Sequence, residues 1–273
     1  MRIVGLARGL VAVASASLAI LSLTYVDSAP LGQALPAGIP EREIWLYGSA
    51  SLLLAASAGL HFSRTALPSV LIISAYEAAW AIACTPRILS NPLSVGAWYG
   101  FCEALTSLVG PGILCVTFLL RAPGFEMPIS TEPAVRAARV VFGLTCVFYG
   151  WSHFAYADYT AGMVPTWLPG RLGFAYFTGL AHMAAGAGLV VGILPRLAAI
   201  LEALMMSSFG LLVWVPSFFT QARPKWATPP ANQWSELVVN LLLAISAWVV
   251  AAALSNRSWA FGPRSRVWRT LTL

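Results

Sequence analysis

The chain has 273 residues, of which 59% are hydrophobic and only 10% carry a charge. A water-soluble domain covers its surface with a much larger charged fraction, so this composition excludes an ordinary soluble enzyme. The formal net charge of +6 does not indicate a nucleic-acid partner, because the Lys and Arg residues fall in predicted loops and tails, where they suit anionic lipid headgroups. We therefore predict an all-α polytopic membrane protein whose main partner is the lipid bilayer.

Apolar stretches follow one another along the chain, each close to the roughly 20 residues that a helix needs to cross a bilayer. Proline and charged residues, such as Pro86 with Arg87, lie at their ends and predict that the helices stop there. The first stretch exceeds the apolar core of a signal peptide, about 7–15 residues, so we interpret it as a retained helix. At this length per span the chain has room for about eight spans. We expect them at residues 3–25, 44–62, 68–86, 97–120, 136–156, 172–193, 197–216 and 233–254.

Residues 122–134 divide the chain into two halves that resemble each other. This segment is rich in proline and glycine and carries acids, so we expect a linker without a helix. Residues 35–40 (LPAGIP) in the first half correspond to residues 164–169 (VPTWLP) in the second, and Tyr47 and Tyr176 follow at the same distance. The two halves therefore read as tandem copies of one unit.

The predicted fold is two parallel four-helix repeats, because four spans per copy leave both copies in the same orientation. The first repeat covers residues 1–121 and the second residues 135–256, and a basic tail follows at residues 257–273. The arginines concentrate on the side of the N-terminus, which predicts a multi-pass membrane protein with both termini in the cytoplasm.

Placing an ionisable side chain inside a bilayer costs free energy, so each such residue is expected to have a structural or functional role. Three of them, His153, His182 and Glu236, fall in the outer half of the second repeat. They predict a polar pocket that opens to the outer face, where imidazole and carboxyl groups exchange protons or bind a quinone headgroup. The same groups could instead hydrogen-bond one another and only hold helices together. The candidates inside the spans are Glu77, Glu103, His153, His182, Glu202 and Glu236.

Aromatic residues accompany this predicted pocket. Trp151 and Trp234 each stand two residues from an ionisable candidate, and Tyr159 follows the fifth span. We expect the two tryptophans to form walls of the pocket and Tyr159 to contact the ligand.

Other features of the spans have less specific interpretations. His153 and His182 sit on adjacent spans but at different predicted depths, so a metal site is not expected and haem is a weaker alternative than quinone. Small residues at 178–188 suit close helix packing, or would leave room for a flat ligand. Glu77 is expected to be a hydrogen-bonded structural carboxyl, and Glu202 to pair with a loop arginine.

The first repeat lacks most of this chemistry. At the offset set by the proline elements, His153 corresponds to Thr24 and His182 to Leu53, and neither side chain titrates near neutral pH. Only the acid is retained, as Glu103, which corresponds to Glu236 after a small shift in register. The first repeat therefore reads as a copy with a degenerate site.

The second half resembles the DoxX-like family of bacterial membrane proteins. The resemblance covers about residues 135–254 and rests on residues 150–154 (GWSHF), the element at 164–169, residues 178–182 (TGLAH) and residues 234–236 (WSE). It implies a four-helix unit related to small membrane subunits of redox systems, including a thiosulfate:quinone oxidoreductase subunit and MauE-type proteins. It also implies that His153, His182 and Glu236 are the residues of interest. The chain departs from the family in being doubled and in lacking paired cysteines.

We expect, in sum, a component of a redox or respiratory system in the bacterial inner membrane that binds a quinone or a similar lipid-soluble ligand. His153 and Glu236 would handle protons, and His182, Trp151, Trp234 and Tyr159 would contact the ligand. A membrane or periplasmic redox partner would carry electrons, and the residues leave open whether the chain itself catalyses a reaction. The alternatives are a non-catalytic membrane scaffold and a small-solute transporter.

Overall fold

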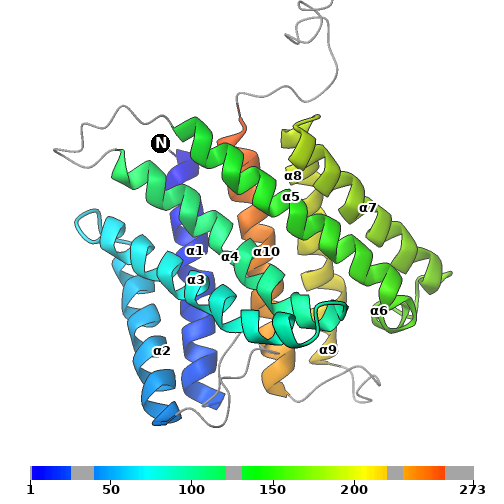
Figure 1. The fold of residues 1–273 in the computed structure, drawn as a ribbon, viewed down its shortest axis with the longest axis horizontal. Helices are drawn as coiled ribbons and strands as arrows, with labels where there is room; N and C mark the ends of the chain where they lie inside the picture. Colours follow the sequence, from blue (N-terminus) through cyan, green and yellow to red (C-terminus); the bar gives the residue numbers. More distant parts are fainter. Residues whose placement is uncertain (1, 26–39, 121–130, 220–229, 256–273) are drawn as a thin grey trace, which may run out of the picture.

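The computed structural model describes residues 2–25, 40–120, 131–219 and 230–255, and every regular element in these ranges is helical. The helices form one bundle of long, inclined rods (Figure 1). In the first half these are α1 (Arg2–Tyr25), α2 (Arg42–Gly59), α3 (Ala66–Ser90) and α4 (Val95–Leu119). In the second half they are α5 (Thr131–Ala155), α6 (Ala157–Met163), α7 (Arg171–Val191), α8 (Pro195–Phe209), a π-helical turn (Gly210–Trp214), α9 (Val215–Ser217) and α10 (Pro230–Ala253).

Six stretches of helix in the described ranges are long and apolar enough to cross a membrane: α1, α3, α4, α7, the continuous rod from α8 to α9, and α10. The helices α5 and α6 together would make a seventh span, but the chain bends by 95° between them. The predicted all-α class with several apolar spans is therefore confirmed. The stretch expected at 44–62 forms the helix α2, which is not among the six.

Two expected helix ends are wrong. Helix α3 continues through Pro86 to Ser90, because a proline inside a helix removes only one backbone donor. Helix α5 begins at Thr131 and takes Pro133 into its first turn, where the missing N–H would have no helical partner in any case. The rest of the expected linker, most of the 35–40 element and the basic tail lie outside the described residues.

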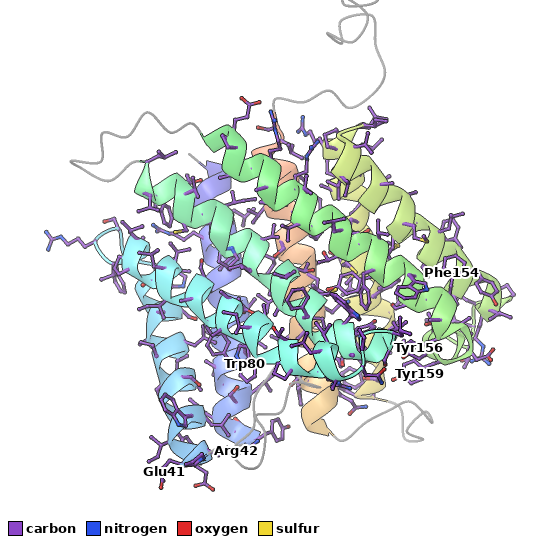
Figure 2. All side chains as sticks on the ribbon, in the orientation of Figure 1. Glu41, Arg42, Trp80, Phe154, Tyr156 and Tyr159 are labelled. Atoms are coloured by element: carbon purple, nitrogen blue, oxygen red, sulfur yellow. The ribbon has the colours of Figure 1, made fainter. Side chains whose placement is uncertain are left out.

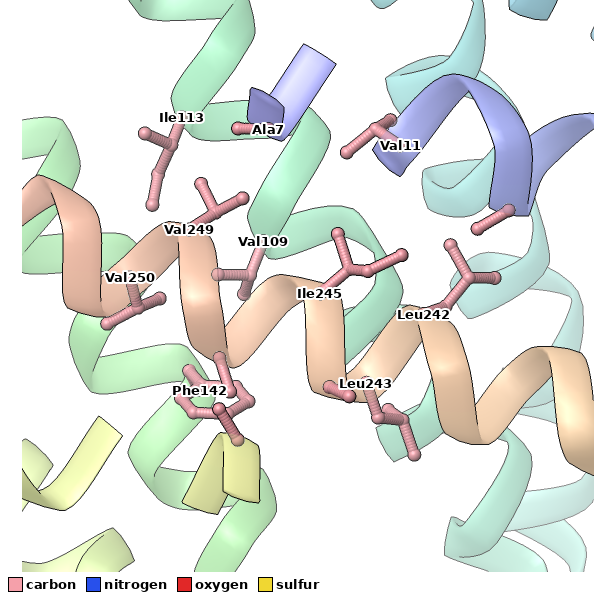
Figure 3. Packing of buried hydrophobic residues seen from close by; sticks show 14 of the residues in the cluster. Ala7, Val11, Val109, Ile113, Phe142, Leu242, Leu243, Ile245, Val249 and Val250 are labelled. Carbon is pink, nitrogen blue, oxygen red and sulfur yellow. The ribbon is translucent and has the colours of Figure 1, made fainter. Parts of the chain in front are cut away.

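Helix α10 lies at the centre of the bundle, in contact with α1, α4, α5 and α8. Figure 3 shows its side chains between those of the surrounding helices. Leu242 and Ile245 of α10 are almost fully buried, as are Val11 of α1, Val109 of α4 and Phe142 of α5. Close van der Waals packing of this kind holds helices together where lipid removes the hydrophobic driving force.

The closest helix contact is between α5 and α7, and glycines line it. A Cβ atom built on Gly186 would lie 2.5 Å from the carbonyl oxygen of Gly143, and one built on Gly150 would lie 2.5 Å from that of Gly179. The two backbones therefore touch, which only glycine allows. The predicted packing role of the small residues at 178–188 is confirmed.

The chain leaves α5 through a sharp bend that packs against the first half. Tyr156, at the bend, brings its hydroxyl to 3.5 Å from the position of a Cβ on Gly96, near the start of α4. Figure 2 shows Tyr156 and Tyr159 together at this corner of the bundle. Helix α6 and the loop at 164–170 then cover the end of the second half.

Replacing Gly186 with alanine should loosen the α5–α7 contact, because the new methyl group collides with the backbone of Gly143. We expect Gly186→Ala to lower the free energy of unfolding by about 1–3 kcal/mol, the usual cost of overpacking. Thermal unfolding of the purified chain in detergent would measure this. The control is Gly173→Ala on the same helix, where a Cβ meets no atom within 4 Å. Equal effects of the two substitutions would contradict the close crossing.

Candidate ligand-binding site

A cavity of about 580 Å³ lies among α4, α5, α7, α8, the π-helical turn and α10, with α6 and the following loop over one end. Its volume is in the range of small-molecule sites, about 300–1,000 Å³. Most of the wall is apolar, with phenylalanine, leucine, methionine and valine side chains. The polar side chains in the wall are Tyr99, Glu103, Tyr149, His153, Thr160, Thr178, His182, Ser208, Glu236 and Asn240.

His153 stands in the last turn of α5 and is oriented by α7. Its Nδ1 atom lies 2.9 Å from the hydroxyl oxygen of Thr178. That hydroxyl lies 2.9 Å from the carbonyl oxygen of Phe174, to which it donates. The Thr178 oxygen therefore accepts from His153, so Nδ1 carries the hydrogen and Nε2 is left as the acceptor nitrogen.

His182 stands in the middle of α7 and is held by a carboxyl group of α8. Its Nδ1 lies 2.6 Å from Oε1 of Glu202, and both side chains are 1% exposed. The expected pairing of Glu202 with a loop arginine is wrong. Glu202 lies two turns into α8 on its buried face, so its partner comes from inside the bundle and not from a loop.

The two histidines lie side by side. Their ring centroids are 5.1 Å apart, and the ring of Phe209 lies 6.1 Å from His153 and 5.9 Å from His182. The expectation that they occupy different depths is therefore wrong. Helix α5 ends at Ala155, whereas α7 begins at Arg171. The first turns of α7 therefore run beyond the end of α5, and the middle of α7 meets its last turn.

Two carboxyl groups from different halves of the chain face the same cavity. Glu236 comes from α10 and Glu103 from α4, and both line its wall. The side chain of Glu103 is 6% exposed. Glu103, the acid that the first repeat retains, therefore lines the cavity of the second repeat.

Three aromatic residues expected at the site stand outside its wall. Trp151 is 50% exposed and packs on Phe148, and Trp234 is 44% exposed and packs on Phe218 with ring centroids 4.3 Å apart. Each tryptophan lies two residues from a site residue, and this spacing places it on nearly the opposite face of its helix. Tyr159 is 51% exposed at the corner formed by α6.

Sequence reasoning missed several residues of the wall that share a helix face with a site residue. Tyr149 precedes His153 by four residues, Asn240 follows Glu236 by four, and Tyr99 precedes Glu103 by four. A spacing of four puts two residues on one face of a helix, so this signal was present in the sequence.

Glu77 lies away from the cavity, in α3. It is 1% exposed, and neither carboxyl oxygen has a hydrogen-bond partner within the described ranges. The expectation of a hydrogen-bonded structural carboxyl is therefore wrong for this part of the chain. In the same ranges, no group of three or more His, Cys, Asp or Glu side chains could hold a metal ion.

Comparison with known proteins gives one match. The model of a family described as a domain of unknown function (DUF8561) matches residues 142–251, from α5 to α10. That range holds the two histidines, Glu202 and Glu236, and leaves Tyr99 and Glu103 outside. No curated protein and no solved structure matches the chain.

The pair of His182 and Glu202 should show strong coupling in a double-mutant cycle. His182→Phe or Glu202→Leu alone leaves a buried polar group unpaired, which we expect to cost about 1–3 kcal/mol of unfolding free energy. The double variant removes both groups and should recover about 1 kcal/mol or more of the summed loss. Thermal unfolding in detergent measures all four proteins. Strictly additive losses would show that the hydrogen bond does not form.

Proposed function

We propose that this protein is a DoxX-like component of an inner-membrane redox system that binds a quinone or a similar lipid-soluble ligand in the cavity. One observation carries the proposal: both imidazole rings and both acids converge on a single apolar-walled cavity. The family resemblance points to His153, His182 and Glu236, and all three line this cavity. Such a site suits a flat apolar ring with polar oxygens at its edge.

The polar groups suit a ligand that exchanges protons. With its hydrogen on Nδ1, His153 presents Nε2 as an acceptor for a hydroxyl group. His182 has Nδ1 engaged by Glu202, so its Nε2 accepts when the ring is neutral and donates when a second proton binds. Glu103 and Glu236 provide a nearby place for that proton. Conversion of a quinone to a quinol needs electrons as well, which a membrane or periplasmic redox partner would supply.

The proposal includes eight spans arranged as two parallel repeats, residues 1–121 and 135–256. Its support is the pattern of helix contacts. Within the halves, α1 packs on α2 as α5 packs on α7, and α3 packs on α4 as α8 packs on α10. Between the halves, α4 contacts α5 as α10 contacts α1, while α4 and α10 contact each other. A two-fold axis between α4 and α10 would generate all these contacts.

The proposed orientation places both termini in the cytoplasm of a bacterium. The start of α1 and the end of α10 lie at the same end of the bundle (Figure 1). Arg8, Arg136, Arg139 and Arg196 lie near that end by their positions in α1, α5 and α8. The cavity, covered by α6, would then lie toward the outer face, in agreement with the positive-inside rule.

A non-catalytic scaffold is the second candidate, and one observation favours it. The hydrogen bond between His182 and Glu202 is buried and joins α7 to α8, as expected of polar residues that only fix a helix pair. In that case the cavity would have no specific ligand. Ligand binding therefore separates the two candidates.

Binding of a short-tailed benzoquinone to the full chain in lipid nanodiscs tests the proposal. We expect His153→Ala and Glu236→Gln each to weaken binding at least about tenfold, because each removes a polar group from the cavity wall. Trp151→Phe is the control on α5, since its side chain points away from the cavity. Unchanged affinity in both site variants, or absence of binding by the unmodified chain, would contradict the proposal.

A further inference from the structure

The cavity is open on the side where α7 and α8 meet. Phe177 of α7, Leu201 of α8 and Leu212 of the π-helical turn that follows α8 belong to its wall. These three residues are also 65%, 54% and 45% exposed. A side chain that both lines a cavity and faces the surroundings stands at its rim. These three residues, with Ala181 and Ser208, form what we name the α7–α8 portal.

The packing of the helices agrees with an opening at this place. Helix α7 packs much more closely on α5 than on α8. The end of the cavity toward the outer face is covered instead, by Met163 of α6 and by Val164, Pro165 and Leu168 of the next loop. These apolar side chains make poor contacts for a water-soluble solute.

The portal faces hydrocarbon rather than water. Leu201 is six residues into α8, which at 1.5 Å per residue is about 9 Å from the helix start, and Leu212 is about 26 Å from it. The rod from Pro195 to Ser217 is one of the candidate membrane spans. The portal therefore extends along the middle of a span, where only lipid chains lie outside the protein.

We infer that the ligand is an amphiphile whose headgroup lies beside His153 and His182 and whose hydrocarbon tail leaves through the α7–α8 portal into the bilayer. This inference rests on the proposed function and narrows its ligand class. A cavity of about 580 Å³ accommodates a ring and the first part of a tail. A tail long enough to cross half of the hydrocarbon core, about 15 Å, has to leave it. The apolar rim offers that tail a path without a polar barrier.

The test compares two probes on the full chain in lipid nanodiscs: a benzoquinone with a ten-carbon alkyl tail, and the same ring without the tail. For the unmodified chain we expect the tailed probe to bind more tightly in competition experiments. Leu201→Trp narrows the portal, so we expect it to weaken binding of the tailed probe at least about tenfold and to weaken binding of the tail-less probe by a clearly smaller factor. Ser208→Trp narrows the same portal and serves as the second variant if the first does not fold.

Leu204→Trp is the matched control. Leu204 lies on the same helix and is 49% exposed, but it is not part of the cavity wall, so both probes should bind this variant as they bind the unmodified chain. Equal weakening of both probes by the portal variants, or unchanged binding of the tailed probe, would overturn the inference. A tail that adds no affinity in the unmodified chain would overturn it while the proposed function stands. Failure of both probes to bind the unmodified chain would overturn both.

Discussion

The close crossing of α5 and α7 is the contact on which the site depends. Glycines let the two backbones touch, and a Cβ built on Gly179 would lie 2.9 Å from the Cβ atom of His153. This contact brings the last turn of α5 against the middle of α7, so that His153 and His182 lie 5.1 Å apart. Helix α8 then completes the arrangement, because Glu202 holds the ring of His182 from the other side. A bulkier residue at the crossing would separate the rings even if every polar group were kept.

The cost of charge in hydrocarbon explains why the polar groups gather in one place. The centre of the bundle around α10 is apolar over most of its length (Figure 3). Near one end, α4 and α10 direct Glu103 and Glu236 into the same cavity as the histidines. Buried polar groups that share hydrogen-bond partners, protons or a ligand lower the free-energy cost of burying one another. An isolated buried group keeps its full cost. Glu77 is the exception among the described residues, a buried carboxyl group without a hydrogen-bond partner.

The long helices were predictable from hydropathy and from the residues at their ends, and most of these ends fall within a few residues of those expected from sequence. One error arose at Pro86, because a proline within a long helix removes one backbone donor without necessarily ending the helix. At the site, the sequence indicated His153, His182 and Glu236 because ionisable residues are rare in spans. It could not show that Glu202 faces His182, because that depends on the angle between α7 and α8. A search for residues four positions from His153, on the same face of the helix, would have selected Tyr149 instead of Trp151 as a wall residue.

Mass spectrometry of the lipids that remain with the chain after gentle purification in detergent tests the central claim most directly. The unmodified protein should retain a quinone or a related amphiphile in equal molar amount, and His153→Ala purified in the same way should lose it. A protein that retains only bulk membrane lipid, or a variant that retains the same molecule in the same amount, would contradict a ligand site in this cavity.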